Sequence, residues 1–245
     1  MTSGVAEHRR DRAIRGRLVA RSGLDRATRD AMLALLSGHF DGVEAGIFEA
    51  DLAGKDHVIL LEDEQGALQG FSTLHVYESR AAGAPVTVIY SGDTIVWRDV
   101  WGSPVLARTW IQSAAQLTGG ARGAKDVYWL LLTSGFRTYR FLPVFYRRFH
   151  PRFDEPTPPV ERHLIDALAA ERFGSSYDQA RGIVRFPRPQ VLKPELLEVP
   201  VGRSRDPHIA FFLQANPGFV HGDELVCVTR VHEDNLTPAG RRMLR

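Results

Sequence analysis

The sequence contains one cysteine, Cys227, so the chain cannot form an internal disulfide bond. A chain of 245 residues does not need one, because a protein of that size buries roughly 70% or more of its unfolded surface. Sparse cysteine is typical of a reducing compartment, and we expect a cytoplasmic protein. The thiol stands in the apolar run 225–228, which predicts a small buried side chain.

Long apolar runs and a strong charge excess are also missing. No stretch approaches the roughly 20 apolar residues that cross a bilayer, and no apolar segment follows the first arginines. We therefore expect no membrane partner and no secretory signal. Lys and Arg total 31 against 29 Asp and Glu, a formal net charge of +2. That balance does not by itself indicate a nucleic-acid partner.

Several well-known catalytic motifs are absent. The nine histidines show no metal-ligand spacing, and neither His-Glu-x-x-His nor Cys-x-x-Cys occurs, so we predict no metal site. Gly-x-Ser-x-Gly and a phosphate loop ending in Gly-Lys-Ser/Thr are missing too, which argues against a serine hydrolase of that type and a P-loop enzyme. A lone strand histidine such as His75 is more often packed or exposed than catalytic.

Periodicity and turn residues predict alternating helices and strands. Asp25 is a plausible helix N-cap, Gly54 a helix end, and Pro104 suits a first helical turn. Gly92, inside a β-rich run, indicates a bulge or a close approach of backbone or ligand. The expected helices are 25–39, 43–53, 104–118 and 137–149, the last kinked at Pro143, and the expected strands are 57–61, 68–77, 86–97 and 127–133.

The second part of the chain is less regular. A Pro-rich connector at 151–159 precedes expected helices at 160–172 and 177–182, and 187–207 shows no period. We expect strands 209–213 and 224–230 to close the fold as a hairpin. The predicted organisation is a flexible basic arm, 1–17, and a single domain, 18–245, with 151–207 as an insertion or linker region. The arm could instead contact phosphate or a partner.

The order of these elements resembles the GNAT acetyltransferase superfamily, over roughly 25–150 and again in the closing strands. In that family a long strand leads into a loop written Gln/Arg-x-x-Gly-x-Gly/Ala, whose N–H groups hold the pyrophosphate of acyl-CoA at a helix N-terminus. Here the loop reads Arg98-Asp99-Val100-Trp101-Gly102-Ser103. Arg98 and the small Ser103 suit the pattern. Trp101 replaces a glycine, Gly102 is one place out of register, and Pro104 removes an N–H.

The resemblance implies an α/β fold, an α+β mixed sheet of the acyl-CoA N-acyltransferase kind, with an insertion before the closing hairpin. It also implies acyl-CoA or an acyl-carrier thioester as co-substrate, held by Arg98, Trp101, Gly102 and Ser103. Trp101 could stack on a base or pantetheine arm, block the cleft, or pack under the helix. Thr133 and Ser134 end the buried strand, where open α/β sheets bind ligands, although they could simply cap the next helix.

Acyl transfer to an amine needs a base and an acid for the leaving thiol. By resemblance, Asp93 on the long strand is the candidate base, and Tyr139 or Tyr146 is the candidate acid. Asp93 could instead only bond backbone at a bulge. Either tyrosine could be a core residue with a partner for its hydroxyl.

Segments 90–94 and 135–140 are similar to those of a bacterial branch of the superfamily, a likeness that supplies a fold but no activity. Four arginines, Arg137, Arg140, Arg147 and Arg148, could meet CoA phosphates or an acidic acyl carrier protein, or form a solvated helix face. The sequence thus predicts a GNAT-like acyltransferase acting on an amine or other small acceptor. The alternative is a GNAT-shaped binding or interaction protein without catalysis.

Overall fold

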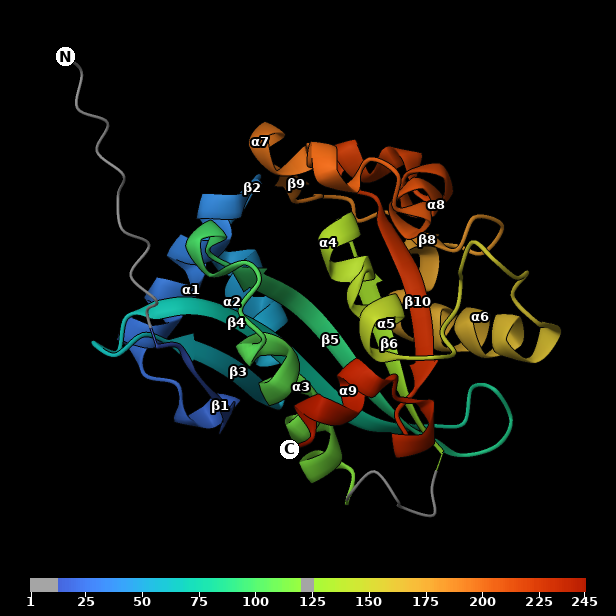
Figure 1. Ribbon diagram of the computed structural model, residues 1–245, viewed down its shortest axis with the longest axis horizontal. Helices are drawn as coiled ribbons and strands as arrows, with labels where there is room; N and C mark the ends of the chain where they lie inside the picture. The colour runs from blue at the N-terminus through green and yellow to red at the C-terminus, as the bar shows by residue number, and fades with distance from the viewer. Residues whose placement is uncertain (1–12, 120–125) are drawn as a thin grey trace.

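The computed structural model describes residues 13–119 and 126–245 and contains an eight-stranded mixed sheet (Figure 1). Its strand order is β1-β3-β4-β5-β6-β10-β8-β7. The strands are β1 Arg15–Ala20, β3 His57–Glu62, β4 Leu68–Ser79, β5 Val86–Val96, β6 Val127–Thr133, β7 Tyr177–Asp178, β8 Ile183–Val184 and β10 Glu224–Arg230. A second, two-stranded sheet joins β2 Phe40–Asp41 to β9 Val191–Leu192. The predicted mixed α/β class is confirmed.

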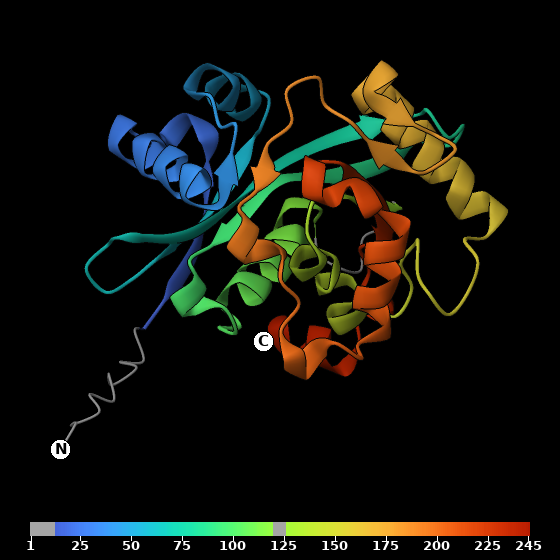
Figure 2. The same cartoon turned by 90° about the horizontal axis from the view of Figure 1, so that it is seen from above.

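Helices cover both faces of the large sheet. Figure 2 shows α1 Arg26–His39 and α2 Ala45–Ala53 at one end of a face and α6 Pro159–Phe173 at its other end. The opposite face carries α3, α4, α5, α8 and α9. Their bounds are Val105–Leu117, Phe136–Tyr139, Phe141–Phe145, Pro207–Ala215 and Pro238–Met243, and α7 is Pro194–Leu197.

Strand alternation divides the core between these two layers. Val58 and Leu60 of β3 pack with α1 and α2, whereas Ile59 and Leu61 join the cluster under α3. The same alternation runs through β6, where Leu130 meets α6. Every central strand is therefore buried on both sides, which explains why 127–133 is continuously apolar.

One neighbouring pair in the sheet is parallel. β5 and β6 pair from Thr87↔Val127 to Ser91↔Leu131, and α3 provides the crossover between them. All other neighbouring pairs in the large sheet are antiparallel, including β10 with β6. Parallel pairing brings the carboxyl ends of β5 and β6 to the same edge of the sheet.

Four expectations need correction. Residues 209–213 lie in α8 instead of a strand, because an apolar run of that length fits a buried helix as well as a strand. β10 therefore pairs with β6 and β8 and forms no closing hairpin with 209–213. Residues 177–182 form β7 and a turn instead of a helix.

The other two corrections concern boundaries. The segment 137–149 divides into α4 and α5, and the chain is extended again from Tyr146, which bridges Leu236. Residues 15–17 belong to β1, where Arg17 forms an ion pair with Glu62 at 2.8 Å. The rest of the predicted arm, through residue 12, lies outside the described residues.

Segment 151–207 adds to the fold in three places. It supplies α6, places β8 against β10, and pairs β9 with β2. Figure 2 shows its chain, in orange, arching from β8 to β9 between α2 and α6. This arch lies over the edge where β5 and β6 end.

Candidate active site

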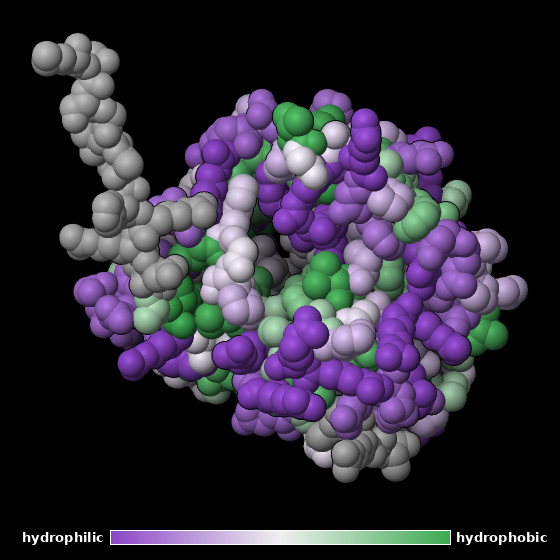
Figure 3. All heavy atoms as spheres, viewed as in Figure 1, coloured by the Kyte–Doolittle hydropathy of each residue, from purple (hydrophilic) through white to green (hydrophobic). Residues whose placement is uncertain are grey.

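A cavity of about 470 Å³ opens where the β5–β6 pairing stops. Side chains from α1, α2, β5, the end of β6, the start of β10 and the arch after β8 line it. In Figure 3 the surface is hollowed between the loop after β5 and α4. The separation of two parallel strands thus produces a slot that helices on one face then enclose.

A β-bulge shapes the floor of this cavity. The register between β4 and β5 shifts between Ser72 and Leu74, and the bulge predicted at Gly92 is confirmed. A Cβ added at Gly92 would lie 2.9 Å from the Lys55 side chain and 2.8 Å from Thr73 Oγ1. Only glycine lets the bulged strand pass this close to its neighbours.

Three carboxylates line one end of the cavity: Asp51 from α2, Asp93 from the bulge and Glu224 from the first residue of β10. Burial raises the pKa of Asp93 to about 7, with a further rise from Asp51. Burial and the neighbouring Asp93 raise the pKa of Glu224 to about 8. Both side chains keep part of their surface open to the cavity, so they are shielded from bulk water yet reachable by a ligand. Carboxyl groups that ionise near neutral pH can exchange protons during a reaction.

Lys55 provides the nearest positive charge. Its side chain is fully buried, and its ammonium donates to the Asp51 carboxylate and lies 5.3 Å from the centre of the Tyr90 ring. Its charge lowers the pKa of Asp93 and of Glu224, although burial outweighs it at both groups. The pairing with Asp51 leaves the other two carboxylates to face the cavity.

Trp101 and Arg137 form one rim. The Trp101 indole N–H donates to the Val96 carbonyl at 2.8 Å, and the Arg137 guanidinium lies 4.4 Å from its ring centre. Arg137 also donates to the carbonyls of Leu196 and Glu198. Trp101 is therefore a fixed wall, 37% exposed, and leaves the cavity open.

The other residues predicted for the phosphate loop lie beside the cavity without lining it. Gly102 has a positive φ of 104°, a conformation that glycine adopts readily. Ser103 Oγ accepts from the N–H of Val105 at 3.3 Å, and α3 has no other side-chain cap. The N-terminus of α3 thus keeps backbone donors, and Arg98 stands on the same loop.

Thr133 and Ser134, at the end of β6, line the cavity. Thr133 Oγ1 accepts from the N–H of Gly135 at 3.3 Å and donates to its carbonyl at 2.8 Å. This hydroxyl therefore also orders the turn into α4, so the capping alternative describes part of its role.

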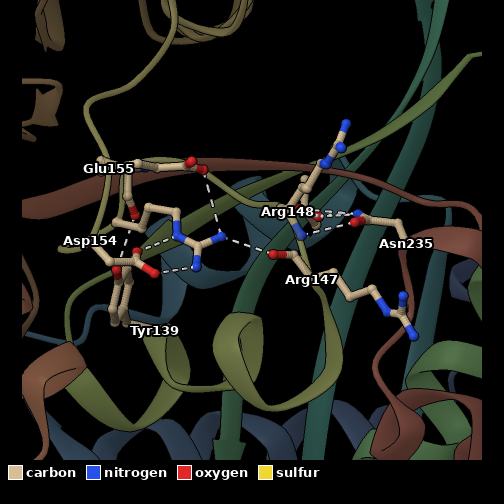
Figure 4. Close-up of polar contacts among 9 residues, drawn as sticks. Tyr139, Arg147, Arg148, Asp154, Glu155 and Asn235 are labelled. Atoms are coloured by element: carbon tan, nitrogen blue, oxygen red, sulfur yellow. Dashed lines mark hydrogen bonds and ion pairs between the residues drawn. The ribbon is translucent and has the colours of Figure 1, made fainter.

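Neither tyrosine proposed as the acid lines the cavity. Tyr139 is fully buried, and its hydroxyl donates to the Pro151 carbonyl at 3.0 Å, beside Asp154 and Glu155 (Figure 4). Tyr146 is buried against Trp129, with ring centres 5.9 Å apart. Burial raises the pKa of both phenols far above the ordinary value. Both are core residues, because the short helices α4 and α5 turn them toward α8 and the sheet.

The other arginines of this region are engaged away from the cavity, two through their side chains and Arg148 through its backbone. Arg140 forms an ion pair with Asp206 at 2.7 Å, and Arg147 donates to the Leu236 carbonyl. Figure 4 shows the Arg148 backbone held by Asn235. These arginines do not line the cavity, and they do not share one helix face.

Sequence reasoning missed Asp51, Lys55, Glu224 and the buried His39. His39 lines the cavity and directs one ring nitrogen to the Leu35 carbonyl and the other to the Val96 carbonyl. Among these four residues, only Lys55 gives a local signal in the sequence. It directly follows the helix-ending Gly54, where the chain turns into a buried strand. Glu224 gave none, because a charged residue at the start of a strand usually faces solvent.

Among the described residues, no group of three His, Cys, Asp or Glu side chains could hold a metal ion. Across residues 13–119 and 126–245, no helix is both long and apolar enough to span a bilayer.

Several solved structures are similar to part of this chain. No family model matches the sequence, and no curated protein does. A GNAT family N-acetyltransferase from Escherichia coli in complex with CoA is 14% identical, with a TM-score of 0.39 over 54% of this chain and 70% of that one. An acyl-CoA N-acyltransferase from Pseudomonas aeruginosa is 15% identical, with a TM-score of 0.35 over 61% and 94%.

A probable N-acyltransferase from Enterococcus faecalis is 11% identical, with a TM-score of 0.40 over 55% of this chain. The present chain spans 33% of that longer protein. All three structures are described as N-acyltransferases or N-acetyltransferases. At these TM-scores the fold description rests on the strand order and helix layers of the chain itself.

Proposed function

We propose that the protein is an acyltransferase that moves an acyl group from acyl-CoA, or from an acyl-carrier thioester, to a small amine. The observation that carries this proposal is the position of Asp93. It lies on a bulge, where two parallel strands separate, in a cavity bordered by the loop that leads to the N-terminus of α3.

The chemistry follows from this placement. The Asp93 carboxylate accepts a proton from the acceptor's ammonium, and the neutral nitrogen attacks the thioester carbonyl carbon. A C–N bond forms, the C–S bond breaks, and the leaving sulfur takes the proton that the attacking nitrogen releases. After Ser91, β5 no longer pairs with β6. Backbone N–H groups on that side of β5 can therefore donate to the thioester carbonyl oxygen.

The donor's phosphates would lie outside the cavity, at the N-terminus of α3. Backbone donors, the helix dipole and Arg98 favour an anion there. The acyl arm would enter past Trp101. Segment 151–207 would act as the insertion that shapes the acceptor side, which the cavity-lining Phe186 and Leu192 support. A cytoplasmic location would supply the thioester.

Isothermal titration calorimetry with acetyl-CoA, longer acyl-CoAs and an acyl-carrier thioester tests the donor. We expect binding to one of them, weakened by Arg98→Ala and unchanged by Arg148→Ala, which removes a cation away from the cavity. If none of these donors binds, the acyltransferase proposal is wrong.

A binding protein without catalysis is the second candidate. It is favoured by the fixed Trp101 wall and by the absence, among the described lining residues, of the two predicted acid tyrosines. In that case Asp93→Asn would leave the cellular effect of the protein intact. Loss of that effect in a stably folded variant would contradict it.

A further inference from the structure

The cavity has two kinds of lining that together describe a ligand. Apolar side chains form its walls: Phe40 beside α1, Ile47 and Phe48 from α2, and Phe186 and Leu192 from the arch. The carboxylates lie together at one end of the same space. An occupant that fits both parts has an apolar body and one positively charged end.

Two of the three carboxylates have no partner in the protein. Among the described residues, the side-chain carboxylates of Asp93 and Glu224 have no hydrogen bond and no ion pair, whereas that of Asp51 is paired with Lys55. Burial is the main cause of the raised pKa at both groups, so water does not fully replace a partner. A shielded carboxylate without a partner either holds a proton or is compensated by a positively charged ligand.

The two arginines that line the cavity have partners other than these carboxylates. Arg137 donates to two backbone carbonyls of the α7 region and stacks between Trp101 and Phe136. Arg188 forms an ion pair with Glu44 at 3.3 Å. Both positive groups are held at the rim, so the positive charge that the acidic end lacks would have to come from the ligand.

We propose that the acyl acceptor is a singly charged amine with an apolar body, and that Glu224 is the specificity-determining residue that holds its ammonium group. This inference rests on the proposed function, because it assigns the acceptor side of the same cavity. Asp93 then remains free to take the proton. Glu224 comes from β10, so the acceptor end is completed by the strand beside β6.

The apolar walls of the cavity determine which amines fit. Each methylene buried against them contributes about 0.8 kcal/mol. A second charge on the ligand would lie against Phe48 or Leu192, where an unpaired ion is strongly disfavoured. A diamine without an apolar body is excluded on this ground. An α-amino acid carries its carboxylate on the same carbon as its ammonium, so that carboxylate would lie beside Asp93 and Glu224 and be repelled by them.

Calorimetry without any acyl donor tests the inference directly. The probes are 2-phenylethylamine, its neutral analogue 2-phenylethanol, putrescine and phenylalanine, each titrated at pH 7.5. The variants are Glu224→Gln, Phe186→Ala and, as a control, Glu195→Gln, which removes an exposed carboxylate on α7. Thermal unfolding of each variant verifies that it is folded.

We expect 2-phenylethylamine to bind most tightly. Glu224→Gln should weaken it by about 10- to 100-fold, the usual effect of losing a charged hydrogen bond, and leave 2-phenylethanol unchanged. Phe186→Ala should weaken 2-phenylethylamine and not putrescine, and the control should change nothing. Equal binding of amine and alcohol, tightest binding of putrescine, no binding of any probe, or no effect of Glu224→Gln would each overturn the inference.

Acyl-CoA binding, measured separately on the same protein, distinguishes the two proposals. If 2-phenylethylamine binds through Glu224 and no acyl donor binds, the proposed acyltransferase is wrong and the amine site stands. If an acyl donor binds and no amine does, the acceptor assignment alone is wrong.

Discussion

At the scale of single residues, Lys55 lies under the β5 bulge with its side chain fully buried, and its ammonium meets the Asp51 carboxylate. A cation in this position favours the ionised form of every carboxyl group near it. Its ammonium is paired with Asp51, so neither Asp93 nor Glu224 has a positive partner of its own. The ionisation of Asp93 therefore depends on a residue that does not line the cavity.

Replacing Lys55 with methionine should raise the pKa of Asp93 above about 7 and that of Glu224 above about 8, because the favourable charge is lost while burial remains. NMR titration of ¹³C-labelled Asp and Glu carboxyl groups measures both values without any substrate. Lys193→Met, a lysine away from the cavity, is the matched control. An unchanged Asp93 titration in a folded Lys55→Met variant would show that the cation does not act on it.

The raised pKa of Asp93 also makes stability depend on pH. The folded protein holds this proton up to about pH 7, whereas the unfolded chain releases it near pH 3.8, so stability should fall as the pH rises through that interval. Asp93→Asn removes this loss. We expect the free energy of unfolding of Asp93→Asn, relative to that of the parent, to be about 2 kcal/mol higher at pH 8 than at pH 5, so the variant is relatively more stable at pH 8.

Urea unfolding at the two pH values measures this difference. Asp30→Asn, on the exposed face of α1, serves as the control and should show no such trend. A relative stability of Asp93→Asn that is the same at pH 5 and pH 8 would contradict the burial argument.

At the scale of elements, the β5 bulge joins fold to site. It turns Asp93 toward the cavity and brings Gly92 against Lys55 and Thr73. Before the bulge, even-numbered residues of β5 such as Tyr90 face the layer of α1, α2 and α6. After the bulge, the odd-numbered residue Ile95 faces the same layer. The strand can therefore pack on both sides of the bulge while exposing polar atoms at it.

Gly92→Ala should destabilise the protein by about 1–3 kcal/mol, because the added Cβ would lie within 3 Å of the Lys55 and Thr73 side chains. Gly46→Ala is the matched control, since nothing lies within 4 Å of a Cβ at that position of α2. There the change should stabilise by about 0.5–1 kcal/mol. Thermal and urea unfolding of both variants tests this, and equal effects would contradict the close approach.

At the scale of the whole molecule, the part of segment 151–207 that follows β8 is tied to the rest of the fold at a few points around the cavity. Arg137 is one of them, since it joins α4 to the carbonyls of Leu196 and Glu198 and to Trp101. The pairing of β9 with β2 is another. The enclosed cavity depends on these contacts, because the arch itself contributes little to the two-sided core.

Arg137→Met should loosen this segment without unfolding the sheet. Amide hydrogen exchange over 187–200 should become faster by about tenfold or more, as expected when hydrogen bonds worth about 1.4 kcal/mol in total are lost. Exchange in β5 and β6 should not change. Arg140→Met, which breaks an ion pair at α8, is the comparison and should affect 206–215 instead. Unchanged exchange at 187–200 would show that Arg137 does not hold the arch.

The sequence by itself determined the elements whose periodicity is local and strong: α1, α3, the central strands and the bulge at Gly92. It also led to Asp93, Trp101, Thr133 and Ser134, which the structure brings to one cavity. Residues 209–213 were expected to form a strand, since a short apolar run does not distinguish a strand from a buried helix. The segment 137–149 was expected to form one kinked helix, and it divides into α4 and α5 instead. The acidic end of the cavity was decided by tertiary structure alone. Asp51, Lys55 and Glu224 come from three separate elements, and only the separation of β5 from β6, with β10 alongside, places their charges in one shielded space.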